Sequence, residues 1–67
     1  MSWRHGALVR FAGQAFKHTL SRRWVRPGAP GRVLALRDDP EAGRLYLVRW
    51  TGHRWPVQHN PTDLEDR

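Results

Sequence analysis

The chain has 67 residues, a formal net charge of +6 and no cysteine. A chain of this length forms one domain at most, which buries only about 60% of the surface that the unfolded chain exposes. Because cysteine is absent, neither disulfides nor thiolate metal sites can stabilise the fold. No apolar run approaches the roughly 20 residues that a membrane-spanning helix needs. Extra stability is expected from oligomerisation or from the four tryptophans, which are Trp3, Trp24, Trp50 and Trp55.

Charge is divided unevenly along the chain. Residues 1–37 contain eight Lys or Arg and no acid, whereas residues 38–67 contain four Arg and six acids. This imbalance predicts a side of the molecule that faces a polyanion. Eleven of the twelve cations are arginine, whose planar guanidinium suits phosphate and base edges. A GC-rich genome would produce the same enrichment.

The arginine-rich, acid-free start of the chain also resembles an organellar transit peptide. Removal of residues 1–30 would leave too little chain to fold. We therefore expect a cytoplasmic protein with no membrane partner.

Residues 6–24 can be interpreted in two ways. Val9 and Phe11 fall on one face of a strand, with Arg10 between them. The same stretch also has apolar residues at helical spacing, but Gly6 and Gly13 would each cost a helix interior about 1 kcal/mol relative to alanine. We expect a strand over about 7–11, followed by a helical turn or ordered loop over 14–24.

The remaining elements are predicted to be strands and turns. The segment RPGAPG at 26–31 is typical of a turn, and RVLALR at 32–37 is typical of a strand. The acidic segment at 38–43 predicts a hairpin loop. A short return strand over 54–58 is weakened by Pro56, and one helical turn near the end would place Leu64 on the core.

Residues 44–51, RLYLVRWT, form the clearest predicted strand. Tyr46, Val48 and Trp50 alternate toward one face, which we expect to be the core. Leu45 and Leu47 lie on the other face. A strand face that is exposed to water would not carry two leucines. We expect that face to be covered by residues 14–24 or by a second subunit, which would make the protein a homo-oligomer.

These elements predict a single mainly β domain over residues 1–67. The segments GALVRF, GRVLAL, LYLVRWTGH and PTDLE resemble a small SH3-like barrel of the Tudor and KOW type, with four to five strands. The run YLVRWTGH resembles in particular a family of short actinobacterial proteins of unassigned function. That resemblance implies the fold and no activity.

A second resemblance is to the plasmid-borne, trimethoprim-resistant (type II) dihydrofolate reductases, which are SH3-like barrels that work as tetramers around one pore. Their pore segment reads Val-Gln-Ile-Tyr-Pro, and Val57, Gln58 and Pro61 match it. His59 stands for the Ile whose backbone meets the nicotinamide cofactor, and Asn60 stands for the Tyr. The resemblance implies a reductase as an alternative function, although the Tyr hydroxyl is missing.

Other catalytic and metal motifs are absent from the sequence. No two of the four histidines have the spacing of three or four residues that places two ligands on one face. No Ser-His-Asp order and no Gly-rich phosphate loop is present. We expect no metal, no cofactor and no enzymatic activity from these motifs.

Two segments combine cations with aromatic rings, as nucleic-acid interfaces do. KHTLSRRWVR at 17–26 and RWTGHRW at 49–55 offer phosphate contacts beside rings that could stack on bases. We therefore expect DNA or RNA binding. The candidate residues are Lys17, Arg22, Arg23, Trp24, Arg26, Arg49, Arg54 and Trp55.

Two alternatives remain open. The chain could be a protein-interaction (adaptor) module with an aromatic pocket formed by Tyr46, Trp50 and Trp55. Alternatively, Trp24 and Trp50 belong to the core and the arginines only keep the protein soluble.

Overall fold

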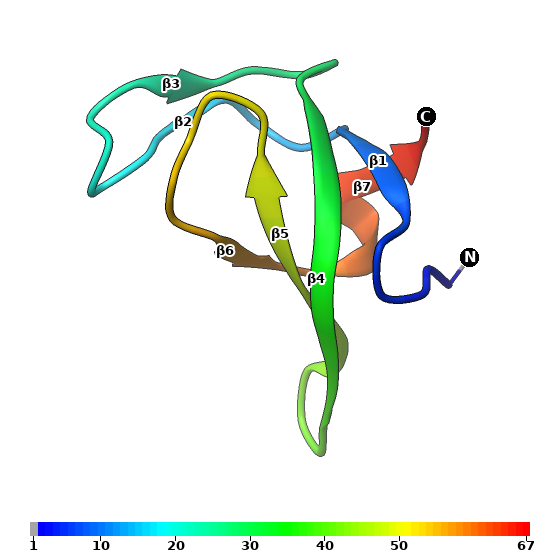
Figure 1. Ribbon diagram of the computed structural model, residues 1–67. Helices are drawn as coiled ribbons and strands as arrows, with labels where there is room; N and C mark the ends of the chain where they lie inside the picture. The colour runs from blue at the N-terminus through cyan, green and yellow to red at the C-terminus, as the bar shows by residue number, and fades with distance from the viewer. Residues whose placement is uncertain (1) are drawn as a thin grey trace.

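The computed structural model describes residues 2–67, which form a mainly β fold (Figure 1). The elements are β1 (Leu8–Phe11), β2 (Phe16–Lys17), β3 (Trp24–Val25), β4 (Pro30–Asp39), β5 (Gly43–Trp50), β6 (Val57–His59), the 3-10 turn η1 (Pro61–Asp63) and β7 (Leu64–Asp66). The predicted mainly β fold class is confirmed. Among these residues there is no helix long and apolar enough to cross a membrane.

The strands form two antiparallel sheets. The larger has the order β6-β5-β4-β1-β7, and the smaller pairs β2 with β3. Within residues 2–67, neither sheet closes into a barrel. The long β4–β5 hairpin forms the centre of the larger sheet, and the first described residues and the C-terminus lie near β1 and β7 (Figure 1).

Three predicted boundaries differ from those observed. Strand β4 begins inside the predicted 26–31 turn, because Pro30 and Gly31 already pair with β1. Strand β6 begins at Val57, after Pro56, which has no amide hydrogen for a ladder. Residues 14–24 form an ordered loop that carries β2 and β3, and the helical alternative is wrong because Phe16 pairs with Val25 in a sheet.

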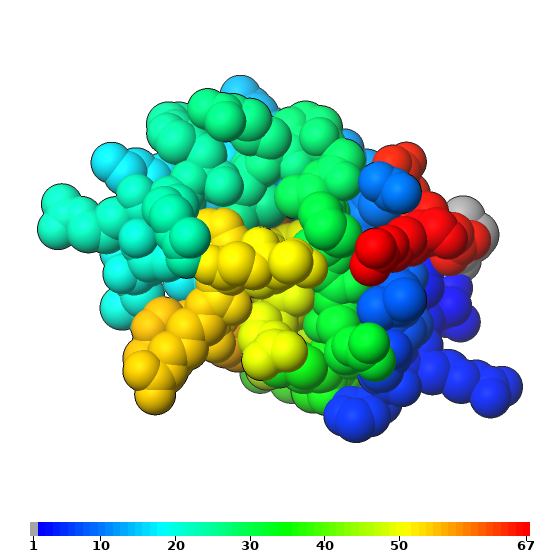
Figure 2. Space-filling model, turned by 45° about the horizontal axis from the view of Figure 1, so that its top comes forward, coloured from blue at the N-terminus to red at the C-terminus, as the bar shows by residue number. Residues whose placement is uncertain are grey.

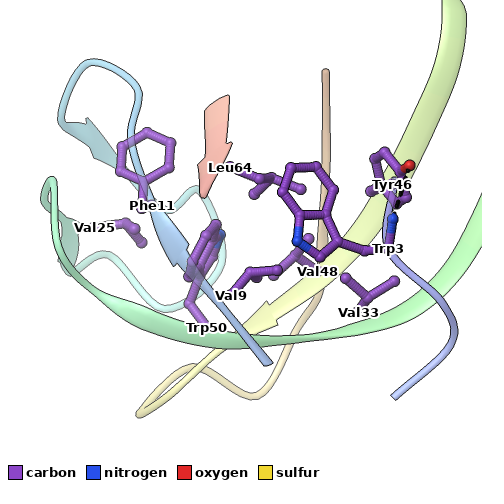
Figure 3. Packing of buried hydrophobic residues seen from close by; sticks show 9 residues of the cluster. All are labelled: Trp3, Val9, Phe11, Val25, Val33, Tyr46, Val48, Trp50 and Leu64. Atoms are coloured by element: carbon purple, nitrogen blue, oxygen red, sulfur yellow. Dashed lines mark hydrogen bonds between the residues drawn. The ribbon is translucent and has the colours of Figure 1, made fainter. Parts of the chain in front are cut away.

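The predicted core strand is confirmed. Tyr46 and Val48 are fully buried and Trp50 is 1% exposed, while Arg49 between them is exposed. Figure 3 shows these side chains enclosed with others from β1, β4 and the two ends of the chain. The aromatic rings meet edge to face, and Trp50 lies 5.3 Å from Phe11 between ring centroids, a favoured geometry for aromatic pairs.

The two ends of the chain are joined through Trp3. Its indole Nε1 donates to Asp66 Oδ1 at 2.7 Å. Its backbone nitrogen donates to the Tyr46 hydroxyl at 3.2 Å, as Figure 3 shows. The predicted turn near the C-terminal end is present as η1, and Leu64, which follows it, is buried as expected. These contacts enclose a core that has few residues to fill it.

The face of β5 opposite the core is partly covered within the single chain. Leu45 is 7% exposed and Leu47 is half-buried. A cavity of about 170 Å³ on this face is lined by Ala35, Leu36, Arg37, Leu45, Leu47 and Gln58, and so by no residue of the 14–24 segment. Homo-oligomerisation through Leu45 and Leu47 stays a prediction.

A buried histidine makes the stability of the core sensitive to pH. Trp50 Nε1 donates to His59 Nε2 at 3.0 Å, and His59 Nδ1 lies 3.4 Å from Asp63 Oδ2. Since an indole nitrogen can only donate, Nε2 is unprotonated and the neutral ring carries its proton on Nδ1. Burial lowers the pKa of His59 below its ordinary value of 6.5, and the hydrogen bond with Asp63 offsets part of that effect.

We therefore expect the fold to lose stability on acidification. Below a pH of 6.5, the ordinary value for histidine, the unfolded chain takes up a proton at His59 more readily than the folded chain does. The free energy of unfolding should then decrease as the pH falls. Urea titrations at several pH values measure this slope, and it should be shallower in His59→Gln, whose amide oxygen can still accept from Trp50. An NMR titration of the His59 ring with a midpoint above its ordinary value would contradict the prediction.

Candidate nucleic-acid interface

The predicted binding residues all lie at the surface. The first segment forms the β2–β3 hairpin and the residues that follow it, and the second covers the end of β5 and the loop to β6. All eight side chains are exposed: Lys17, Arg22, Arg23, Trp24, Arg26, Arg49, Arg54 and Trp55. Trp24 is 52% exposed, so the alternative that placed it in the core is wrong.

The hairpin presents its polar and aromatic side chains through strand alternation. Phe16 pairs with Val25, and Lys17 pairs with Trp24. Successive side chains of a strand point to opposite faces. Val25 is buried and Phe16 packs against the core, so Lys17 and Trp24 project from the other face. A cation and an indole ring therefore stand directly opposite each other at the surface.

The β2–β3 hairpin is fastened to the β5–β6 loop by three side chains, of which the sequence analysis identified only Arg23. His18 Nε2 lies 2.8 Å from the Trp55 carbonyl oxygen, and Ser21 Oγ lies 2.6 Å from His53 Nδ1. The Arg23 guanidinium donates to the Gly52 carbonyl. We call these three contacts the hairpin latch. Figure 2 shows the cyan to green hairpin lying against the yellow to orange loop.

His18 is the centre of the hairpin latch. It is 4% exposed, and its Nδ1 accepts the backbone N–H groups of Leu20 at 3.1 Å and Ser21 at 3.3 Å. Because Nδ1 accepts, Nε2 carries the proton of the neutral ring and donates to the carbonyl of Trp55. The ring also stacks on His53, with centroids 5.1 Å apart and planes at 19°. One imidazole thus shapes the hairpin turn and fixes it to the loop.

The surroundings of His53 are electropositive. Burial lowers the pKa of His53 below its ordinary value, and the nearby His18 and Arg23 lower it further. The neutral form of His53 is therefore favoured beside the Arg23 guanidinium. On the neighbouring residue, the guanidinium of Arg54 lies 5.2 Å from the centre of the Trp55 ring, a cation–π distance. Loop and hairpin form one basic, aromatic surface.

The residues assigned to the two alternative functions do not form a surface cluster like that of the hairpin and the loop. Tyr46 and Trp50 are enclosed in the core, so the predicted aromatic pocket with Trp55 is wrong. The four residues assigned to the reductase alternative, Val57, Gln58, His59 and Asn60, lie on and after β6. Among them His59 is buried and Val57 half-buried, while Gln58 and Asn60 are exposed. Nothing in this geometry tests reductase activity.

Sequence reasoning also missed two cations beside the loop. A cavity of about 410 Å³ is lined by the four arginines Arg32, Arg49, Arg54 and Arg67, among other residues. Arg49 and Arg54 are predicted residues, whereas Arg32 comes from β4 and Arg67 follows β7. Arg32 could have been identified only from its register with Arg49, and that register depends on the pairing of β4 with β5.

No metal centre is formed by the described residues. Across positions 2–67, no three His, Cys, Asp or Glu side chains gather in a way that could hold a metal ion. No protein-family model, curated protein or solved structure matches the chain. The resemblances to SH3-like barrels and to the reductases therefore stay predictions.

We expect His18→Ala to release the hairpin from the loop. The substitution removes the acceptor for two backbone N–H groups and the donor for the Trp55 carbonyl. Leaving such part-buried groups unpaired should reduce the free energy of unfolding by about 1–3 kcal/mol. Hydrogen exchange should accelerate at the backbone amides of positions 18 and 22, which donate to the carbonyls of Arg23 and His18, as NMR would show.

Two further variants separate the two roles of His18. Thr19→Ala changes an exposed neighbour and should leave exchange in the hairpin unchanged. His18→Asn keeps a short acceptor for the hairpin turn but cannot reach Trp55, so it should preserve the turn and still lose the docking. Unchanged exchange in both His18 variants would show that the hairpin latch does not hold the hairpin.

Proposed function

We propose that the protein binds nucleic acid, with arginine and lysine contacting phosphates and exposed tryptophans stacking on bases. The observation that carries this proposal is the docking of the β2–β3 hairpin on the β5–β6 loop. The hairpin latch brings together two basic, aromatic segments that are about 30 residues apart in the sequence. Clustered cations with interleaved aromatic rings are the usual platform for single strands.

The distribution of acids supports this proposal. Asp38 and Asp39 lie at the tip of the β4–β5 hairpin, far from the β2–β3 hairpin (Figure 1). There Asp38 pairs with Arg44, while Asp39 lies 3.8 Å from Arg37. Elsewhere, Asp63 contacts His59 and Asp66 contacts Trp3. Four of the six acids are thus engaged by other groups, and none lines the hollows beside the hairpin and the loop, which leaves the positive potential there free to attract a polyanion.

Each part of the basic surface has a distinct role in this mechanism. Lys17 and Arg22 line one shallow hollow on the hairpin and would contact phosphates. Trp24 would stack on a base. Arg23 differs from its neighbours because its guanidinium is held by Gly52, which makes it a positioning residue. The described residues contain no helix that could enter a groove and read bases, so phosphate contacts should dominate.

The salt dependence of binding tests the phosphate contacts. We expect the affinity for a dT oligonucleotide to fall linearly with salt on a log-log plot, with a slope that reports roughly three to five phosphates at about 0.7–0.9 each. Lys17→Gln combined with Arg22→Gln should reduce the slope by about 1.4–1.8. Fluorescence anisotropy at several salt concentrations measures both slopes.

The matched control is Arg37→Gln with Arg44→Gln. It also removes two positive charges, in this case from the tip of the β4–β5 hairpin, where the exposed ion pairs contribute little stability. Its slope should equal that of the parent. If both double variants bind like the parent at every salt concentration, the hairpin cations only keep the protein soluble and the interaction-module alternative gains support.

Trp24→Ala tests stacking separately from charge. Because about half of this side chain is exposed, the substitution should leave the free energy of unfolding nearly unchanged. Affinity for single strands should fall by about 1–3 kcal/mol if the indole stacks on a base. Leu20→Ala is the control, since it removes an apolar side chain that is 63% exposed on the same hairpin and has no ring. Equal losses in the two variants would argue against stacking.

A further inference from the structure

The arginine cavity, defined as the hollow lined by Arg32, Arg49, Arg54 and Arg67, brings four cationic side chains together in one concavity. It lies on the face of the larger sheet that is opposite the core. Leu8 pairs with Arg32, and Arg32 pairs with Arg49, so the sheet register places them in one row across three strands. Figure 2 looks onto this face, where β4 (green), the end of β5 (yellow) and the C-terminal residues (red) surround the hollow.

The charges in the arginine cavity are not compensated by acids of the described residues. No acidic side chain belongs to its lining. The arginines that form ion pairs among residues 2–67 are Arg37 and Arg44 instead. Moreover, Arg32 and Arg49 are direct cross-strand partners and both are exposed. Like charges directly opposite each other destabilise a sheet. The pairing of Arg32 with Arg49 is therefore unfavourable until an anion binds to it.

The guanidinium groups are also available for binding. Arg32 donates once, to the Gly6 carbonyl at 3.2 Å. Within residues 2–67, Arg49, Arg54 and Arg67 make no side-chain hydrogen bond, and the Arg54 guanidinium lies over the Trp55 ring. An arginine has five N–H donors in a planar fork that matches the oxygens of a phosphate. The cavity therefore offers several unused bidentate donors within one hollow.

The arginine cavity is continuous with the proposed binding surface. Gly52 and His53 belong to its lining, and the same two residues receive the hairpin latch through Arg23 and Ser21. A volume of about 410 Å³ falls in the range of small-ligand sites and exceeds what one phosphate group needs. A strand that stacks on Trp24 thus has an arginine-lined hollow on the other side of the loop.

We propose that the arginine cavity is a phosphate-binding site that holds a backbone phosphate, with its nucleotide, of the bound strand. This inference rests on the proposed nucleic-acid binding and adds Arg32 and Arg67 to the residues that carry it. Arg32 and Arg49 act as one pair, each directing its fork at the same phosphate. Arg54 extends the site toward Trp55, and through the loop toward the hairpin.

The first test uses inorganic phosphate alone. The arginine Nε–Hε resonances of the ¹⁵N-labelled chain are followed by NMR during a phosphate titration at constant ionic strength. Arg32 and Arg49 should shift saturably, whereas Arg37 and Arg44 at the hairpin tip should not. Equal shifts at all four arginines, or no shifts, would overturn the site.

The second test uses Arg32→Gln combined with Arg49→Gln. Because the substitution removes two opposed like charges, the variant should be at least as stable as the parent in the absence of ligand. Its phosphate-induced shift at Arg54 should disappear, and the salt slope for a dT oligonucleotide should fall by about 1.4–1.8. A marked loss of stability would show that the arginine pair is structural and would overturn the proposal.

The outcomes separate the site from the proposed function. If oligonucleotide binding depends on Lys17 and Arg22 but is unchanged by the Arg32/Arg49 substitution, the proposed cavity site is wrong and nucleic-acid binding stands. If phosphate shifts Arg32 and Arg49 but no oligonucleotide binds, the site stands for a small phosphorylated ligand and the proposed function is wrong. If a glutamate peptide binds as tightly as the oligonucleotide, the preference for phosphate is overturned.

Discussion

The close approach of Trp50 to Gly31 is the constraint on which the rest of the structure depends. The two residues are cross-strand partners in β4 and β5, and a Cβ atom on Gly31 would lie 2.6 Å from the Trp50 ring. Only glycine allows the indole to lie over the backbone here. This pairing buries Trp50, turns Arg49 outward opposite Arg32 and starts the β5–β6 loop at Thr51, whose amide donates to Pro30.

A core this small is completed by polar groups as well as by apolar ones. Trp3 joins the first described residues to β7 through Asp66, and His59 joins β6 to Trp50 and Asp63. In the described part of the chain, no buried side-chain nitrogen or oxygen lacks a partner. The same principle operates at the surface, where His18 closes the hairpin and fixes it to the loop. Imidazole suits both places because one nitrogen accepts while the other donates.

The residue types of the candidate site could be predicted from the sequence better than their arrangement in space. Lys17, Trp24 and Arg54 could be selected because cations beside aromatic rings are visible in a linear sequence. Arg32 could not be selected, since only the β4–β5 register places it opposite Arg49. No pattern in the sequence marks His18 as buried, and it is buried because the loop folds back over the hairpin. Long-range contacts of this kind leave no periodic signal.

The sequence by itself determined the mainly β class, the core face of β5 and the division of charge. Alternation in 44–51 assigns Tyr46, Val48 and Trp50 to one face, because side chains alternate along a strand whatever its neighbours are. Only the tertiary structure decided that residues 14–24 pair as strands, that Trp24 lies at the surface and that four arginines share one cavity. Those outcomes depend on which segments meet in space, and in a sheet that choice is made by non-local pairing.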